Sequence, residues 1–156
     1  MTKKFIGKED FANLQKNKSG IYISNDYITV YKKVYCKNRL YNSRTSFDSE
    51  ESVHDIFNPE SIVELEIAPG AIIVKPVSNN YTKMNKMRTN KAIVNKITRL
   101  IDNKQIDDSY VCYSTYDPSF RYKVGSTVGT RLDTNVNKTN VSGIHFFKDQ
   151  KEAENY

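Results

Sequence analysis

The residue in this 156-residue sequence that is best suited to acid–base chemistry is His145, in the stretch SGIHFF. A histidine acts as a general base only when a second group orients it and a substrate proton lies within reach. A cysteine nucleophile, Cys36 or Cys112, paired with His145 would be an alternative, but no local signature of a cysteine enzyme surrounds either residue. We therefore expect His145 to be a structural histidine. An enzyme that uses His145 is the third and weakest functional hypothesis.

The two cysteines lack the spacing of a metal site. Cys36 and Cys112 lie far apart, with no CxxC pair and no Cys/His ligand pattern, so we expect two reduced, buried thiols and no bound metal or cofactor. The phosphate-binding motifs GxxxxGK[ST] and GxGxxG are absent as well. The nearest stretch, GSTVG at 125–129, is more typical of a turn, because glycine adopts the backbone angles that turns require.

A row of tyrosines gives the strongest binding signal. In YITVYKKVY, strand alternation places Tyr27, Tyr31 and Tyr35 on one face together with Lys33. Exposed rings beside lysine can stack on unpaired bases while the lysine meets phosphate. Such a row is equally typical of a protein–protein interface or of internal packing, and all three interpretations stay open. A nucleic-acid surface would be extended by a second set of basic residues: Lys83, Lys86, Arg88 and Lys91.

Charge is distributed unevenly along the chain. The net charge is +6, yet residues 45–74 contain acidic residues and no Lys or Arg, whereas the flanking segments are basic. A basic face opposite an acidic loop would attract phosphate or an acidic partner. Alternatively, the acidic block neutralises its basic neighbours within the fold.

The elements that must position these residues are mainly strands. We expect a short helix over residues 8–20, a β-hairpin over 20–36 that turns at Asn25–Asp26, and a long polar loop over 37–60. Residues 61–77 predict two strands around a Pro69–Gly70 turn. Residues 88–102 fit a strand or an amphipathic helix, and the β-branched residues favour the strand.

The C-terminal third continues this pattern. Residues 108–128 predict two strands joined by a turn at Asp117–Pro118, and residues 143–147 predict an inner strand of the core. A helix should begin at Asp149, with a D-x-x-E capping pair to Glu152. The sequence thus predicts one α+β domain over residues 1–156, mostly antiparallel β, with a short N-terminal helix and a C-terminal helix after the GIHFF strand. No secretory signal or membrane-spanning run is visible, so we expect a protein that is not secreted and has no membrane partner.

Several segments resemble a domain of unknown function found in large DNA viruses, phages and bacteria, sometimes beside pentapeptide repeats. They are YKKV (31–34), IVELEIAPGA (62–71), KMRTNKAIV (86–94), STYDPSFRYKVGSTV (114–128) and GIHFFKDQKEAENY (143–156). The resemblance covers about residues 31–156, and GIHFF with its acidic helix is its most specific part. It implies a viral or phage context and no established activity.

The sequence departs from the family pattern at two positions. Met87 stands where relatives carry Cys in KCR, and Asn140 stands where they carry Cys three residues before the glycine of GIHFF. The joint loss suggests that the two positions are neighbours in space. Any metal or redox function built on that pair would be absent here.

The functional prediction combines these observations. We expect a non-enzymatic phage or viral protein that acts through protein–protein contacts, as a virion component or an accessory factor, located in the host cytoplasm or the virion. Tyr27, Tyr31, Tyr35 and the 40–60 segment would form the contacts. The alternative is a basic protein that binds single-stranded nucleic acid through the Tyr face with Lys33, Lys83, Lys86, Arg88 and Lys91.

Overall fold

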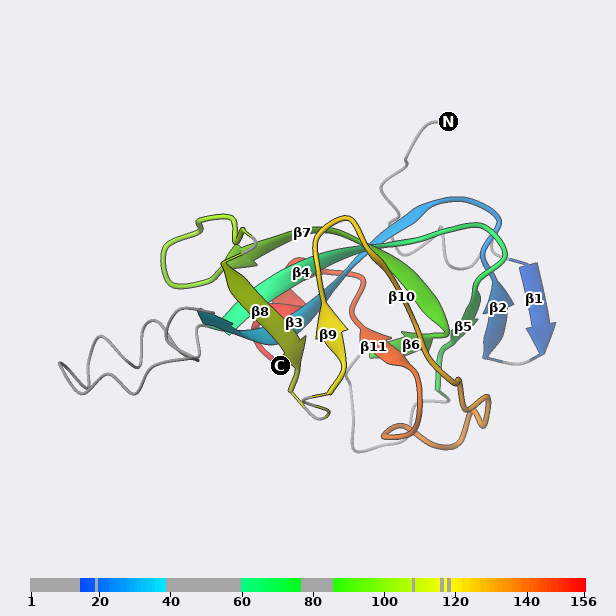
Figure 1. Cartoon of the computed structure of the whole chain (residues 1–156). Helices are drawn as coiled ribbons and strands as arrows, with labels where there is room; N and C mark the ends of the chain where they lie inside the picture. The colour runs from blue at the N-terminus through cyan, green and yellow to red at the C-terminus, as the bar shows by residue number, and fades with distance from the viewer. Residues whose placement is uncertain are drawn as a thin grey trace, which may run out of the picture.

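The structure, a computed structural model, describes residues 15–18, 20–38, 60–76, 86–107, 109–115, 117 and 119–156. This part of the chain forms eleven strands and one short helix (Figure 1). The elements are β1 (Gln15–Lys18), β2 (Ile21–Ile23), β3 (Ile28–Asn38), β4 (Glu60–Ile67), β5 (Ile72–Val74), β6 (Met87–Thr89), β7 (Lys91–Arg99), β8 (Tyr110–Ser114), β9 (Arg121–Tyr122), β10 (Thr127–Gly129), β11 (Ile144–Phe146) and α4 (Gln150–Glu154).

The strands form two antiparallel sheets. The larger has the order β10-β7-β4-β3-β8-β9, and the smaller has the order β1-β2-β5-β6-β11. One buried cluster joins them, since it contains Val30 and Leu65 from the larger sheet together with Ile73 and Phe146 from the smaller. The two sheets therefore share one hydrophobic core.

Strand alternation explains which side chains enter this core. In β3, Ile28, Val30, Val34 and Cys36 are fully buried, while the odd-numbered side chains between them are partly exposed. Adjacent β4, ESIVELEI, is buried on both faces over most of its length. A strand covered on both sides is usually apolar, and β4 follows this rule at Ile62, Val63, Leu65 and Ile67, whereas Ser61 and Glu66 are buried polar exceptions.

The helix α4 covers the outer face of the larger sheet. It packs on β3 and β4 through a second apolar cluster that contains Tyr31, Ile62, Phe147 and Ala153. A bridge between Tyr31 and Phe147, with N···O distances of 2.7 and 2.8 Å, carries the chain from β11 across to β3. The end of GIHFF thus links the two sheets.

The predicted α+β class is wrong, because the described chain is mostly antiparallel β and its single helix spans only Gln150–Glu154. Of the helix predicted over 8–20, residues 15–18 form strand β1, which pairs with β2, and residues 8–14 lie outside the described part. Two apolar residues at helical spacing were a weak signal, and pairing along β2 satisfies the backbone instead. The C-terminal helix does begin after Asp149, but no side-chain capping bond is present.

Two pairing predictions are also wrong. Strands β2 and β3 do not form a hairpin, because β2 pairs with β1 and β5 while β3 pairs with β4 and β8. The chain crosses between the sheets at residues 24–27. Likewise β11 is an edge strand of the smaller sheet, not an inner one, although Ile144, Phe146 and Phe147 are buried as expected.

Other predictions are confirmed. Residues 91–99 form a strand, and a turn occurs at Pro69–Gly70. The turn predicted over 125–129 is confirmed only at Gly125, whose φ is +87°, because Thr127–Gly129 form strand β10. Strands β8 and β9 pair across the Asp117 turn. The ends of the predicted 37–60 loop are strand, because β3 extends to Asn38 and β4 begins at Glu60. Residues 39–59 lie outside the described part.

The cysteines form a disulfide, which corrects the prediction of two reduced thiols. Cys36 of β3 and Cys112 of β8 face each other in the strand register and are bonded, with a Cα–Cα distance of 4.0 Å. Sequence spacing alone did not reveal this pairing, because the two cysteines are 76 positions apart and β4 and β7 of the larger sheet lie between them in the chain. The bridge fixes β8 against β3 inside the core.

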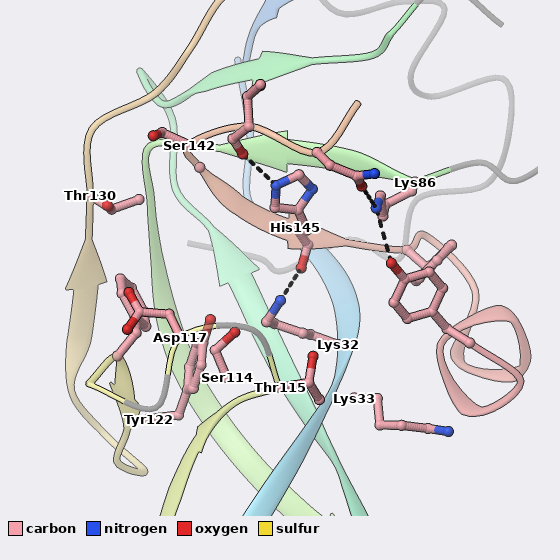
Figure 2. Close-up of a pocket in the computed structure, with 16 residues that line it drawn as sticks. Lys32, Lys33, Lys86, Ser114, Thr115, Asp117, Tyr122, Thr130, Ser142 and His145 are labelled. Carbon is pink, nitrogen blue, oxygen red and sulfur yellow. Dashed lines mark hydrogen bonds between the residues drawn. The ribbon is translucent and has the colours of Figure 1, made fainter. Parts of the chain in front are cut away.

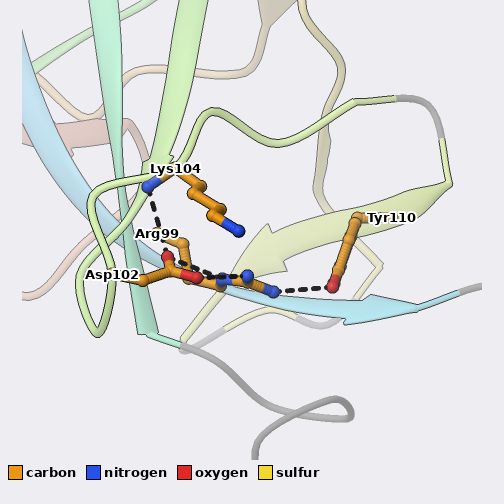
Figure 3. Close-up of polar contacts among 4 residues, drawn as sticks. All are labelled: Arg99, Asp102, Lys104 and Tyr110. Atoms are coloured by element: carbon orange, nitrogen blue, oxygen red, sulfur yellow. Dashed lines mark hydrogen bonds and ion pairs between the residues drawn. The ribbon is translucent and has the colours of Figure 1, made fainter.

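A polar cluster closes the connection from β7 to β8 (Figure 3). Arg99 donates from Nε to Asp102 Oδ1 at 3.0 Å, forms an ion pair with the other Asp102 oxygen, and donates to Tyr110 Oη at 2.7 Å. The hydrogen bonds from Arg99 lower the pKa of the Asp102 carboxyl to about 2. This cluster fixes the turn after β7 to the first residue of β8, so its role is structural.

Candidate functional site: a basic cavity between the sheets

A cavity of about 470 Å³ lies between the inner face of the larger sheet and the β11 end of the smaller sheet (Figure 2). Its wall combines lysines, hydroxyl groups and aromatic rings. The residues that line it include Lys32, Lys33, Lys86, Ser114, Asp117, Phe120, Tyr122, Asn140, Val141, Ser142, Gly143, His145, Phe147 and Tyr156.

Lys32 is the central group of this cavity. Alternation along β3 directs its side chain to the inner face, between the buried residues Val30 and Val34, and only 8% of Lys32 is exposed. Its Nζ donates one hydrogen bond, to the backbone oxygen of His145 at 3.1 Å. Among the described residues, no carboxylate lies within ion-pair distance of this ammonium. Burial, and then the positive charge of Lys86, lower the pKa of Lys32 to about 8.

His145 is held neutral beside Lys32. Its Nε2 lies 2.7 Å from the carbonyl oxygen of Val141, and because a carbonyl can only accept, Nε2 carries the ring proton. Burial lowers the pKa of His145 to about 4, and the positive charges of Lys32, Lys86 and Arg88 act in the same direction, against the opposing effect of the Val141 hydrogen bond. A neutral ring bonded to the backbone fits the structural role expected for this histidine.

Lys86 contributes the second positive charge of the wall. Its Nζ donates to Asn140 Oδ1 at 2.9 Å and to Tyr156 Oη at 3.0 Å, and it lies 5.0 Å from the centre of the Tyr156 ring. That ring in turn packs on Phe147, with 5.3 Å between centroids. The last residues of the chain therefore form part of the cavity wall.

The opposite wall is less charged. Burial, and then the nearby Asp117 carboxylate, raise the pKa of the Tyr122 hydroxyl, which stays protonated at any physiological pH. Phe120 packs against Tyr122 at 5.2 Å between centroids. Asp117 itself is exposed. The cavity thus combines a cationic side with an aromatic side.

Arg88 holds the segment that closes the cavity. The residue is fully buried, and its guanidinium donates to three backbone carbonyls, those of Asp133, Asn135 and Lys138, each at 2.8 Å. Burial lowers the pKa of Arg88, and the charge of Asp133 partly opposes the change. Three charge-assisted bonds fix segment 130–143 against β6.

Gly143, the first residue of GIHFF, permits this arrangement. Its φ is +147°, and a Cβ there would lie 2.9 Å from Leu132 Cδ1 and 3.0 Å from the Cβ and Cδ atoms of Arg88. Any larger residue would push against the arginine that anchors the segment. The glycine of GIHFF and the arginine of the preceding basic segment therefore depend on each other.

The predicted binding residues are only partly brought together. Tyr27, Tyr31 and Tyr35 are partly buried, as β3 alternation predicts, but Tyr31 packs in the cluster beneath α4. Tyr35 donates to Glu60 Oε2 at 3.3 Å, and Lys33 lies 3.7 Å from the same carboxylate. The remaining predicted residues are scattered: Arg88 is buried, Lys91 is exposed, Lys86 lines the cavity, and Lys83 lies outside the described residues.

Sequence reasoning missed Lys32, although the signal was present. A lysine at the inward position of an alternating apolar strand is unusual, because charged side chains are almost never buried without a partner. Tyr122 and Ser114 could not be found in this way, because their place depends on the pairing of β8 with β3 and β9.

The inferred proximity of positions 87 and 140 receives partial support. Asn140 accepts a hydrogen bond from Lys86, the residue before Met87, so the two segments adjoin. Met87 itself is buried in the main core, whereas Asn140 is exposed.

In the described part of the chain, no group of three or more His, Cys, Asp or Glu side chains is placed to bind a metal. No helix of that part is long and apolar enough to cross a membrane.

The fold and the cavity define a class: a two-sheet antiparallel β protein with an internal basic pocket. The chain belongs to a family of unknown function, DUF5758, whose model matches residues 12–153. It is 99% identical over 156 residues to "Uncharacterized protein L223" of Acanthamoeba polyphaga mimivirus, which covers 100% of both chains. It is also 31% identical over 145 residues to "Uncharacterized protein L227" of the same virus, covering 88% of this chain and 82% of the relative. No solved structure matches. The chain is therefore a viral protein.

The first prediction concerns Arg88. Replacing it with Met removes three charge-assisted hydrogen bonds that hold segment 130–143, so Arg88→Met should lower the free energy of unfolding by about 3–5 kcal/mol. Lys91→Met, a change at an exposed lysine nearby in sequence, should change it by less than about 0.5 kcal/mol. Urea denaturation followed by circular dichroism measures both. A loss at Arg88 that does not exceed the loss at Lys91 would contradict an anchoring role.

The second prediction compares two glycines with positive φ. Gly143→Ala should destabilise by more than about 2 kcal/mol, because the new methyl meets Arg88 and Leu132 in addition to an unfavourable φ. Gly125→Ala should cost about 1 kcal/mol, because its φ is +87° but no atom lies within 4 Å of the added Cβ. Thermal unfolding of both variants measures the difference, and equal losses would show that crowding at Arg88 is unimportant.

The third prediction concerns pH. The pKa of His145 is about 4 in the folded chain and 6.5 ordinarily. Between pH 4 and pH 6.5, His145 is therefore protonated in the unfolded chain and neutral in the folded chain. Stability should therefore fall by about 3 kcal/mol as the pH is lowered from 7 to 4. His145→Gln, which keeps an N–H donor for Val141, should lose this part of the pH dependence. Identical slopes for the two proteins in urea titrations at several pH values would refute the assignment.

Proposed function

We propose that this viral protein is a non-enzymatic binding protein that takes an anionic group, a carboxylate or a phosphate, into the cavity around Lys32. The observation that carries the proposal is the burial of the Lys32 ammonium, which has one neutral hydrogen-bond partner and, among the described residues, no carboxylate within ion-pair distance. Asp117, the acidic residue described in the cavity lining, is exposed and forms no ion pair with Lys32. A buried charge is normally paired, since an unpaired one is costly. An anion in the cavity would supply the missing charge.

The surroundings favour an anion over a cation. Lys32 and Lys86 both line the cavity, and the charge of Lys86 lowers the pKa of Lys32, so the potential inside is positive. Ser114 and Ser142 add hydroxyl donors, and Phe120 and Phe147 provide apolar contact. The cavity volume of about 470 Å³ is within the range of small-molecule sites, which combine convergent polar groups with aromatic surface.

This proposal keeps the predicted mode of action through protein contacts, with the anionic group belonging to a partner or to a small ligand. The nucleic-acid alternative has less support. Its platform requires an open Tyr face, but Tyr31 lies beneath α4 and Arg88 is buried in the protein. The disulfide also bears on location, because such bonds persist in oxidising environments, including virion surfaces, and are rare in the cytosol. Of the two expected locations, it favours the virion.

The fourth prediction is that Lys32 lowers stability. The pKa of Lys32 is about 8 in the folded chain and 10.5 ordinarily. At neutral pH, where the amine is protonated in both states, this difference lowers the free energy of unfolding by about 3 kcal/mol. Lys32→Met keeps the apolar volume and forgoes one hydrogen bond worth about 1 kcal/mol, so it should raise the free energy of unfolding by about 2 kcal/mol at pH 7. Wild-type stability should rise from pH 8 to 10.5, where the unfolded chain holds more protons, and the variant should lack that rise.

The same variant tests the binding proposal. Inorganic phosphate or an acidic peptide should raise the melting temperature of the wild-type protein above that in chloride of equal ionic strength. Lys32→Met should abolish this increase. Lys91→Met should retain it, because Lys91 is exposed and does not line the cavity. No effect on the wild type, or an equal effect on Lys32→Met, would refute the proposal.

A further inference from the structure

The Lys32 amine has the setting of a nucleophile as well as of an anion ligand. Its Nζ is held by the His145 carbonyl at 3.1 Å and lies on the wall of a cavity large enough for a small organic molecule. Among the described residues it has no carboxylate partner that would keep it protonated. A second cation, Lys86, lines the same cavity. Lysines become nucleophilic when they are desolvated or lie near another cationic group.

We propose that Lys32 captures a small carbonyl compound that also bears an anionic group, such as a 2-oxo acid, as a reversible imine. The inference goes beyond the proposed function, because it adds a covalent bond, and it rests on that proposal only in using the same cavity.

The step balances without a redox partner. The neutral amine attacks the carbonyl carbon, and the nitrogen lone pair forms the C–N bond while the C=O π electrons move to oxygen. Both protons of the attacking amine end on that oxygen, which leaves as water when the C=N bond forms. The reverse reaction, hydrolysis, releases the carbonyl compound unchanged. The protein therefore needs no co-reactant other than the ligand.

The cavity supplies three conditions for this reaction. The His145 carbonyl accepts an N–H of Lys32 and so restricts the nitrogen lone pair to the two remaining tetrahedral positions. Phe120, Tyr122 and Phe147 line the cavity and provide apolar surface for the organic part of the ligand. Lys86 offers a cationic partner for the ligand's anionic group.

Reductive trapping with glyoxylate tests the inference. The folded protein is incubated with glyoxylate and sodium cyanoborohydride, which reduces an imine to a stable carboxymethyl-lysine, and the sites are located by peptide mass spectrometry over a time course. Burial lowers the pKa of Lys32 to about 8, so a larger fraction of its amine is neutral near pH 7.5. We expect Lys32 to be labelled at least about tenfold faster than the exposed Lys91.

Two controls separate the cavity from general lysine reactivity. Unfolding in urea should remove the preference for Lys32, and Lys123→Met, a change at an exposed lysine that does not line this cavity, should retain it. Labelling of Lys32 at or below the rate of Lys91 in the folded protein would overturn the inference. If phosphate still raises the melting temperature in that case, only the covalent step is lost. If Lys32 is labelled but no anion stabilises the protein, the proposed anion binding fails and the reactive amine stands.

Discussion

The buried guanidinium of Arg88 is the interaction on which the site depends. A fully buried cation is tolerated only when its hydrogen-bond donors are satisfied, and here three backbone carbonyls of one segment satisfy them. These hydrogen bonds hold the irregular segment 130–143 in one conformation against β6. The segment ends at Gly143. Within it, the Val141 carbonyl is bonded to the His145 ring, and Asn140 accepts a hydrogen bond from Lys86. The cavity wall is thus a consequence of one side chain.

Lys32 belongs to a different category of buried charge. Each of the three guanidinium nitrogens of Arg88 donates to a backbone carbonyl, whereas the Lys32 ammonium has one acceptor, although both side chains are buried. An arginine with three satisfied bonds stabilises its surroundings, but a desolvated lysine beside an open volume lowers stability. Residues that reduce stability are concentrated at functional sites, where binding or chemistry requires them. This contrast is the physical reason for assigning function to Lys32 and structure to Arg88.

The sequence predicted the parts of the fold that depend on local signals. The β-branched run of β7, the Pro69–Gly70 turn and the alternation of β3 are all local patterns, and each is present. The errors concern partners distant along the chain. Nothing between Ile23 and Ile28 shows that β2 and β3 enter different sheets, and the Cys36–Cys112 bond depends on the β3–β8 register. The basic cluster of KMRTNK was read as a surface, yet its Arg88 turns inward because an irregular segment 45 or more residues later provides its acceptors.

The residues of the GIHFF motif make structural contacts around the cavity. GIHFF contains Gly143, which makes room for Arg88, and His145, whose backbone oxygen holds Lys32 while its ring bonds to Val141. Its last residue, Phe147, joins the two sheets through Tyr31 and packs on Tyr156. Each of these contacts shapes the cavity, but none places a titrating group of the motif where it could exchange protons with a ligand near neutral pH, since the pKa of His145 is lowered to about 4. The motif therefore builds the site, and the chemistry of the site belongs to lysines outside it.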